Sequence, residues 1–155
     1  MKLVEKRIFI AASPTDVYEL LTDADLLVEW MAPHAELDPR PGGKLMWTHV
    51  NGDSVVGAFV ELVPARRIVF TYGWDREDVR IPPGSTTVEI DLRPHDGGTE
   101  LHLVHRGLAQ PMADAHSGGW SNYLARLAAL AERRDPGPDP LAAKRVPAAR
   151  DLGLQ

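Results

Sequence analysis

The chain has 155 residues, which is the usual length of one domain and enough for a single hydrophobic core. Its 17 Lys and Arg residues against 22 Asp and Glu residues give a net charge of -5, spread along the chain, which argues against nucleic acid as a partner. The sequence contains no cysteine, and this excludes disulfides, thiolate nucleophiles and sulfur-rich metal sites.

The N-terminal segment carries no targeting or membrane signal. Residues 1–7 are charged where a signal peptide needs an apolar core, and no stretch of the chain approaches the roughly 18 apolar residues of a membrane helix. We therefore expect a soluble, cytoplasmic protein without a membrane span. The apolar residues among the charges of segment 3–11 predict a first short strand.

Two short helices are predicted to follow this strand. Ser13 is typical of a helix N-cap, and Pro14 suits the first helical position. Thr22 and Asp25 repeat the capping pattern before a second short helix, which Pro33 ends.

The hydrophobic period then changes from helix-like to strand-like. Residues 43–50 and 54–63 flank the turn Asn51-Gly52-Asp53, and Asn-Gly between two such runs predicts a hairpin. Residues 67–74 form the next predicted strand, with apolar residues alternating along one face. The loop at residues 75–85 is too polar for the core and is a candidate flap at the edge of the sheet.

The last elements are a hairpin and a long helix. Residues 86–93 and 99–106 predict the hairpin, and the short connections make neighbouring strands antiparallel. The helix, at about residues 111–134, is the only element long enough to cover one face of the sheet. The sequence therefore predicts an α+β fold with a six-stranded antiparallel sheet, two short helices and a long C-terminal helix.

One face of the long helix mixes apolar bulk with a titratable ring. The residues on this stripe are Met112, His116, Trp120, Leu124, Leu127 and Ala131. Gly118 and Gly119 lie within the same helix, where each glycine costs roughly 1 kcal/mol relative to alanine. We therefore expect the helix backbone to come close to the sheet or to a ligand at this point.

The end of the chain differs in composition from the rest. Residues 135–155 are rich in Pro, Ala and Arg and show little apolar periodicity. We predict a domain over residues 1–134 and a flexible C-terminal tail over residues 135–155, with at most one short helix around residues 141–146.

Several short motifs occur in these elements in a characteristic order. They are Ala12-Ser13-Pro14 at the first helix, Trp30 at the end of the second, Gly42-Gly43 before the second strand, Gly57 with Glu61 and Pro64 in the third, Gly98-Thr99 before the sixth, His105 near its end and Gly119-Trp120 in the long helix. With this order, residues 3–134 resemble the helix-grip (SRPBCC) superfamily of START-like and Bet v 1-like proteins, and within it the activator of Hsp90 ATPase homologue 1-like (AHSA1-like) group. The resemblance implies a curved sheet and a long helix over a cavity, in which many members bind apolar small molecules.

The cavity that the resemblance implies makes a set of aromatic and titratable residues candidates for ligand binding. They are Trp30, Trp47, Phe59, Glu61, Phe70, Tyr72, Trp74, His105, His116 and Trp120. The aromatic members either line such a cavity or fill an ordinary core. His105 and His116 either act as polar anchors inside the cavity or are half-buried histidines satisfied by hydrogen bonds. Glu61 is either an inward polar anchor and general base or a structural or exposed carboxylate.

No motif in the sequence indicates a metal site, a cofactor or a catalytic residue. The six histidines show neither H-x-H nor H-E-x-x-H spacing. Gly42-Gly43-Lys44 lacks the frame of a phosphate-binding loop, and residues 119–123 lack the pattern of a nucleophile elbow.

Three functional hypotheses follow. The first is the binding of an apolar or aromatic small molecule in the cavity between sheet and C-terminal helix, without established catalysis. The second is an enzyme similar to the polyketide cyclases and aromatases that share the fold, in which a few polar groups move protons. The third, implied by the group that the chain resembles, is a module that interacts with an Hsp90-type chaperone. We expect a monomer or a homodimer.

Overall fold

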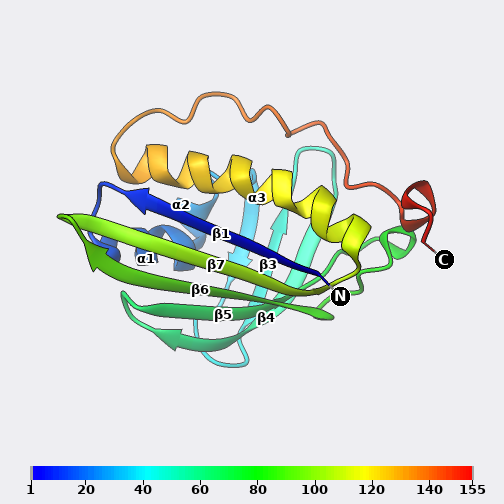
Figure 1. Cartoon of the computed structure of the whole chain (residues 1–155), viewed down its shortest axis with the longest axis horizontal. Coiled ribbons are helices and arrows are strands. Elements are labelled where there is room, and N and C mark those ends of the chain that lie inside the picture. The colour runs from blue at the N-terminus through cyan, green and yellow to red at the C-terminus, as the bar shows by residue number, and fades with distance from the viewer. Residues whose placement is uncertain (1, 155) are drawn as a thin grey trace.

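The computed structural model describes residues 2–154 and shows a long helix lying across one antiparallel sheet (Figure 1). The strands are β1 (Lys2–Ile10), β2 (His34–Leu37), β3 (Lys44–Thr48), β4 (Ser54–Val63), β5 (Arg67–Tyr72), β6 (Thr86–His95) and β7 (Gly98–Leu108). The α-helices are α1 (Pro14–Thr22), α2 (Ala24–Leu27) and α3 (Gln110–Ala131), and two short 3-10 helices are η1 (Glu77–Val79) and η2 (Ala149–Leu152). The α+β class and the long C-terminal helix are as predicted.

The sheet has seven strands in the order β1-β7-β6-β5-β4-β3-β2, so the predicted number of six is wrong. The additional strand is β2, which pairs only with β3, from His34 opposite Thr48 to Leu37 opposite Leu45. It is four residues long and contains no β-branched residue. Short edge strands of this composition give little periodic signal, which is why the sequence pattern missed it.

The start of the first helix is as predicted, but the second helix is capped by a different residue. The Ser13 hydroxyl accepts a hydrogen bond from the backbone N–H of Asp16 at 3.1 Å. At α2 the cap is Asp23, whose carboxylate accepts the backbone N–H of Asp25 at 2.9 Å. Thr22 instead donates its hydroxyl to the carbonyl of Tyr18, one turn earlier, and so belongs to α1.

The core lies between α3 and the covered face of the sheet. The predicted stripe of α3 is buried at Met112, His116, Trp120, Leu124 and Leu127, and Ala131 packs against it. Facing residues come from every strand from β3 to β7, for example Leu45, Phe59, Phe70, Ile90 and Leu103. This packing places the middle of α3, with its histidine and tryptophan, directly over the sheet.

The glycines divide into two groups by the space around them. A Cβ atom at Gly57 in β4 would lie 1.8 Å from the carbonyl oxygen of Thr71, so the two backbones can meet only at a glycine. Cβ atoms at Gly118 and Gly119 in α3 would meet no heavy atom within 4 Å. The sheet therefore does not approach these helical glycines. Of the two alternatives expected at this point, the contact with the sheet is wrong and the contact with a ligand stays a prediction.

The C-terminal segment after α3 turns back and runs along the molecule to the far end of that helix (Figure 1). It ends in η2, which packs against α3 and η1. The helix suggested around residues 141–146 is a turn in the structure. The division into a domain and a flexible tail stays a prediction. Among residues 2–154, no helix is long and apolar enough to cross a membrane.

The contrast between the glycines predicts opposite effects of the same substitution on the free energy of unfolding. Gly57→Ala is expected to lower it by about 1–3 kcal/mol, because the new methyl group overlaps the Thr71 carbonyl. Gly119→Ala is expected to raise it by about 0.5–1 kcal/mol, because alanine suits a helix interior and the space is open. Urea unfolding of both variants measures the difference, and a neutral Gly57→Ala would contradict the described β4–β5 approach.

Candidate functional site

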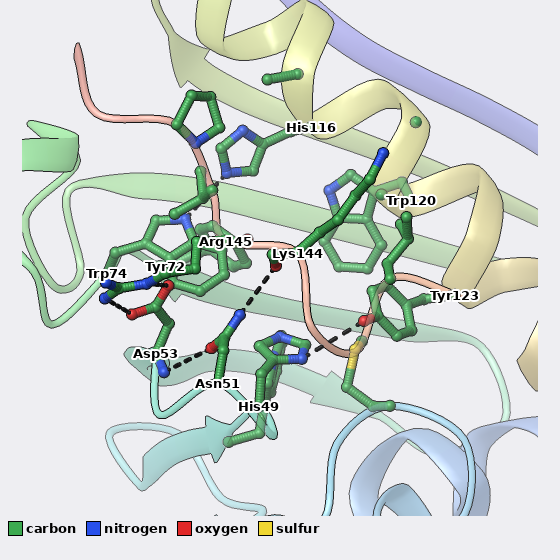
Figure 2. Close-up of a pocket in the computed structure, with 18 residues that line it drawn as sticks. His49, Asn51, Asp53, Tyr72, Trp74, His116, Trp120, Tyr123, Lys144 and Arg145 are labelled. Atoms are coloured by element: carbon green, nitrogen blue, oxygen red, sulfur yellow. Dashed lines mark hydrogen bonds and ion pairs between the residues drawn. The ribbon is translucent and has the colours of Figure 1, made fainter. Parts of the chain in front are cut away.

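A cavity of about 380 Å³ lies between the sheet, α3 and the C-terminal segment (Figure 2). Its aromatic wall is formed by Trp47, His49, Tyr72, Trp74, Trp120 and Tyr123. On the α3 side the wall includes the small residues Ala115, Gly118 and Gly119, so the space left open by the glycines is part of the cavity. On the outer side the wall is formed by Leu141, Lys144, Arg145, Val146 and Pro147 of the C-terminal segment.

Half of the candidate residues named from the sequence line this cavity. They are Trp47, Tyr72, Trp74, His116 and Trp120. Trp30 is buried elsewhere and donates its indole N–H to the carbonyl of Leu20 at 2.9 Å. Phe59 and Phe70 form an edge-to-face pair in the core with ring centroids 6.5 Å apart. The structure thus separates the aromatic set into cavity wall and ordinary core.

Glu61 lies on the opposite face of the sheet from the cavity. A register shift between Phe59 and Glu61, typical of a β-bulge, interrupts the alternation of β4. Glu61 is therefore exposed while Leu62 packs on the core, and the Glu61 carboxylate accepts a hydrogen bond from Arg67 at 2.7 Å. The interpretation as an inward polar anchor and general base does not fit this placement.

His116 is held in one tautomer by two hydrogen bonds. Its Nδ1 lies 2.8 Å from the carbonyl oxygen of Met112, which can only accept, so Nδ1 carries the proton. Its Nε2 therefore accepts the indole N–H of Trp74 at 3.0 Å. This bond joins α3 to the segment that follows β5, and both ring nitrogens of His116 are satisfied.

His105, on β7, is held in the opposite tautomer just behind the cavity wall. Its Nδ1 accepts the indole N–H of Trp120 at 3.1 Å. Its Nε2 lies 2.8 Å from the Thr86 hydroxyl, which already donates to the carbonyl of Tyr72, so Nε2 donates to Thr86. Both ring nitrogens of His105 are again satisfied in the neutral form.

Burial keeps both imidazoles neutral. It lowers the pKa of His105 to about 3, with a further contribution from the neighbouring His116. Burial likewise lowers the pKa of His116, although the Met112 carbonyl acts in the opposite direction. A second proton on either ring would point an N–H at an indole N–H. The geometry therefore favours the structural interpretation of these histidines.

Trp47 differs from the other three tryptophans in its indole N–H, which has no hydrogen-bond partner among residues 2–154. Its side chain is only 3% exposed, and its indole Nε1 is the one buried side-chain nitrogen or oxygen without a hydrogen-bond partner in the described part of the chain. A buried donor without a partner is costly. The ring of Trp47 lines the cavity, but its N–H is enclosed by protein atoms and is not open to the cavity.

The C-terminal segment is fastened to the cavity rim at Asp53, which follows the β3–β4 turn and is only 3% exposed. Its carboxylate accepts hydrogen bonds from Arg145 at 2.5 and 3.1 Å and from Arg76 at 3.0 Å. Burial alone would raise the pKa of Asp53, but the two guanidinium groups outweigh it and lower the pKa. Asn51 donates to the Lys144 carbonyl and Arg76 to the Val146 carbonyl, both at 2.9 Å.

A second attachment lies nearer the end of α3. The Tyr123 hydroxyl donates to Asp139 at 2.6 Å, and the Asn122 amide donates to the same carboxylate at 3.0 Å. Arg126 donates to the carbonyl of Gly137 at 2.9 Å. The segment therefore follows α3 through side chains of that helix.

Sequence reasoning missed several residues of this site. They are His49, Asn51, Asp53, Tyr123, Lys144 and Arg145. Asn51 and Asp53 belong to a turn motif and gave no signal beyond the turn. Lys144 and Arg145 lie in a segment whose composition suggested a flexible tail, and the complementary charges of Asp53 and Arg145, far apart in the chain, carried no local pattern.

The Asp53 contacts predict that one charge controls the attachment of the C-terminal segment. Asp53→Asn is expected to raise amide exchange over residues 144–150 by roughly 5–30-fold, because two guanidinium groups lose their shared carboxylate. Hydrogen exchange followed by mass spectrometry measures this effect. Asp78→Asn is the matched control, since Asp78 binds Arg76 without a hydrogen bond to the segment. Equal protection in wild type and Asp53→Asn would contradict the attachment.

The neutral histidine at position 105 predicts a stability loss in acid. Between about pH 6.5 and pH 3 the unfolded chain binds a proton at His105 that the folded chain excludes, so stability falls as the pH falls. The slope contributed is at most about 1.4 kcal/mol per pH unit, and His105→Gln is expected to remove it from the urea-unfolding profile. As an independent measurement, the His105 ring resonances in the folded protein should not move between pH 8 and pH 5. A ring titrating near pH 6.5 would contradict the neutral, buried state of His105.

The described residues do not form a metal site. Within residues 2–154, no group of three or more His, Asp or Glu side chains is arranged to hold a metal ion. The chemistry that the cavity offers is thus aromatic contact, the imidazoles of His49 and His116, and the charged groups of the C-terminal segment.

Comparison with known proteins shows a family whose model matches most of this chain. The family described as "Activator of Hsp90 ATPase homolog 1-like protein" matches residues 11–132. The human activator of 90 kDa heat shock protein ATPase homolog 1 is 28% identical over 123 residues, which make up 79% of this chain and 34% of the human protein. The chain therefore spans about a third of the length of the curated relatives it matches.

Solved structures agree with this assignment. The AHSA1-like protein of Rhizobium etli, solved by NMR in solution, is 40% identical and has a TM-score of 0.68, with 94% of this chain and 91% of that chain covered. The Aha1 dimer of Colwellia psychrerythraea shares the fold, with 21% identity, a TM-score of 0.71 and coverage of 85% and 97%. Since the family match extends over most of the sequence, the chain belongs to the activator of Hsp90 ATPase homologue 1-like family.

Proposed function

We propose that this protein binds an apolar or aromatic small molecule in the cavity between sheet, α3 and C-terminal segment, without catalysing a reaction on it. The observation that carries the proposal is the cavity itself, about 380 Å³ in volume and lined by seven aromatic or imidazole side chains of the described residues. Ligand pockets usually measure roughly 300–1,000 Å³ and combine an apolar wall with a few polar groups. A small aromatic compound is the ligand class that this volume and wall suit.

The composition of the α3 wall supports an open cavity. Gly118 and Gly119 occupy helix-interior positions where alanine would be more favourable for the helix. No protein atom fills the space beside them. A ligand that occupies this space would account for two glycines that the packing of the protein does not require.

The enzyme hypothesis needs a group that can take up or release a proton at the cavity wall. His116 lines the cavity and His105 lies behind it, but both rings make two hydrogen bonds each in the neutral form. Burial lowers the pKa of both rings, so neither is prepared to act as a base near pH 7. Burial also lowers the pKa of His49, the other imidazole of the cavity wall, although the charges of Asp139 and Asp53 act in the opposite direction. These observations favour binding over a cyclase-like or aromatase-like reaction.

A role with an Hsp90-type chaperone is the second candidate function, because the matched relatives include the human activator of the heat shock protein ATPase. The shared region is a third of that protein, so the interaction remains a proposal for this chain. Binding of the purified protein to a purified Hsp90-type chaperone, followed by light scattering, tests it and also reports whether the protein alone is a monomer or a homodimer. No complex at micromolar concentrations would remove this candidate.

The binding proposal is tested with N-phenyl-1-naphthylamine, an uncharged aromatic probe whose fluorescence rises in an apolar site. Wild type is expected to bind it saturably. Gly119→Leu is expected to weaken binding at least about tenfold, because the leucine side chain enters the cavity. Ala125→Leu, on an exposed position of the same helix, is the matched control and should bind as wild type does. Absence of saturable binding, or equal binding by Gly119→Leu, would remove the proposal.

A further inference from the structure

We infer that the small molecule bound in this cavity is an aromatic acid, whose anionic group is held at the cavity mouth by the ammonium group of Lys144. This inference rests on the proposed binding function and names its ligand class. It starts from the one charged side chain of the cavity wall that lacks an opposite charge among residues 2–154, and it combines that charge with the aromatic rings of the wall.

Lys144 is held over the cavity by its backbone rather than by its charge. The Asn51 amide fixes its carbonyl at 2.9 Å, and the next residue, Arg145, is bound to Asp53. Figure 2 shows the Lys144 side chain extending from the C-terminal segment toward α3, in the direction of His116 and Trp120. Its ammonium group makes no ion pair or hydrogen bond with residues 2–154.

The other charges at the mouth are already neutralised. Asp53 is the single acidic residue among those that line the cavity, and it is shared by Arg145 and Arg76. Arg76 is also paired with Asp78 at 2.7 Å. The four groups balance one another, which leaves the positive charge of Lys144 in excess at the rim of a protein whose net charge is -5. A local positive charge in an acidic protein favours an anionic ligand at that place.

The rings of the wall determine the body of the ligand. Trp47, Tyr72, Trp74 and Trp120 line the cavity, and the N–H groups of Trp74 and Trp120 already donate to histidines. These walls therefore present ring faces and edges, which favour a flat aromatic body. An aromatic acid supplies the ring and the negative charge together.

The test compares two probes with the same aromatic body. N-phenyl-1-naphthylamine is neutral, and 1-anilinonaphthalene-8-sulfonate carries an added sulfonate. Lys144→Met is expected to weaken sulfonate-probe binding by about tenfold and to change neutral-probe binding by less than about twofold. Lys144→Arg should retain binding of the sulfonate probe. Lys44→Met, which removes an exposed lysine of β3 outside the cavity wall, is the matched control and should change neither.

The outcomes separate this inference from the function on which it rests. If Lys144→Met changes the binding of the two probes equally while Gly119→Leu weakens the binding of both, the proposed binding function is retained and the inference of an anionic ligand is overturned. If neither probe binds saturably to the wild-type protein, both the proposed function and the inference are wrong. A selective loss of the sulfonate probe in Lys144→Met, absent at 0.5 M salt, would support an electrostatic contact at the mouth.

Discussion

Two hydrogen bonds between indole and imidazole rings hold α3 at its place above the sheet, and they run in opposite directions. Trp74, just after β5, donates to His116 on the helix, and Trp120 donates from the helix to His105 on β7. Each bond requires a neutral imidazole with a defined tautomer, which Met112 and Thr86 set from the other side of the rings. The four rings fix the separation between helix and sheet. The cavity is the space beside these rings that no side chain fills.

The cavity depends on two parts of the chain with different relationships to known proteins. Strands β2 to β7, α3 and the His–Trp pairs lie within residues 11–132, the region that matches the family. The outer wall, with Lys144 and Arg145, lies after that region and is bound to it mainly through the buried Asp53. The family scaffold thus provides the aromatic interior, and the segment beyond the matched region contributes charge at its mouth.

The sequence predicted those parts of the fold that depend on local patterns. Hydrophobic period, turn residues and the Ser13 cap gave α1, α3 and six of the strands, whereas β2 is too short and too polar to produce a period. The inward stripe of α3 identified His116 and Trp120 because helical spacing decides their direction. The direction of Glu61 stayed open between the two faces, since a single bulge reverses the alternation of β4 and leaves no trace in residue types. Asp53 and Arg145 could not be found, because their contact joins positions 92 residues apart.

The paired glycines of α3 have a consequence for how this protein responds to selection. Natural proteins lie just above the stability that their function needs, and substitutions that improve a helix interior are among the commonest stabilising changes. In this helix the favourable substitutions are located on the wall of the cavity. Laboratory evolution for heat resistance in the absence of a ligand would therefore tend to close the cavity, whereas evolution with a ligand present would retain both glycines. The sequence at positions 118 and 119 would then record which condition the population experienced.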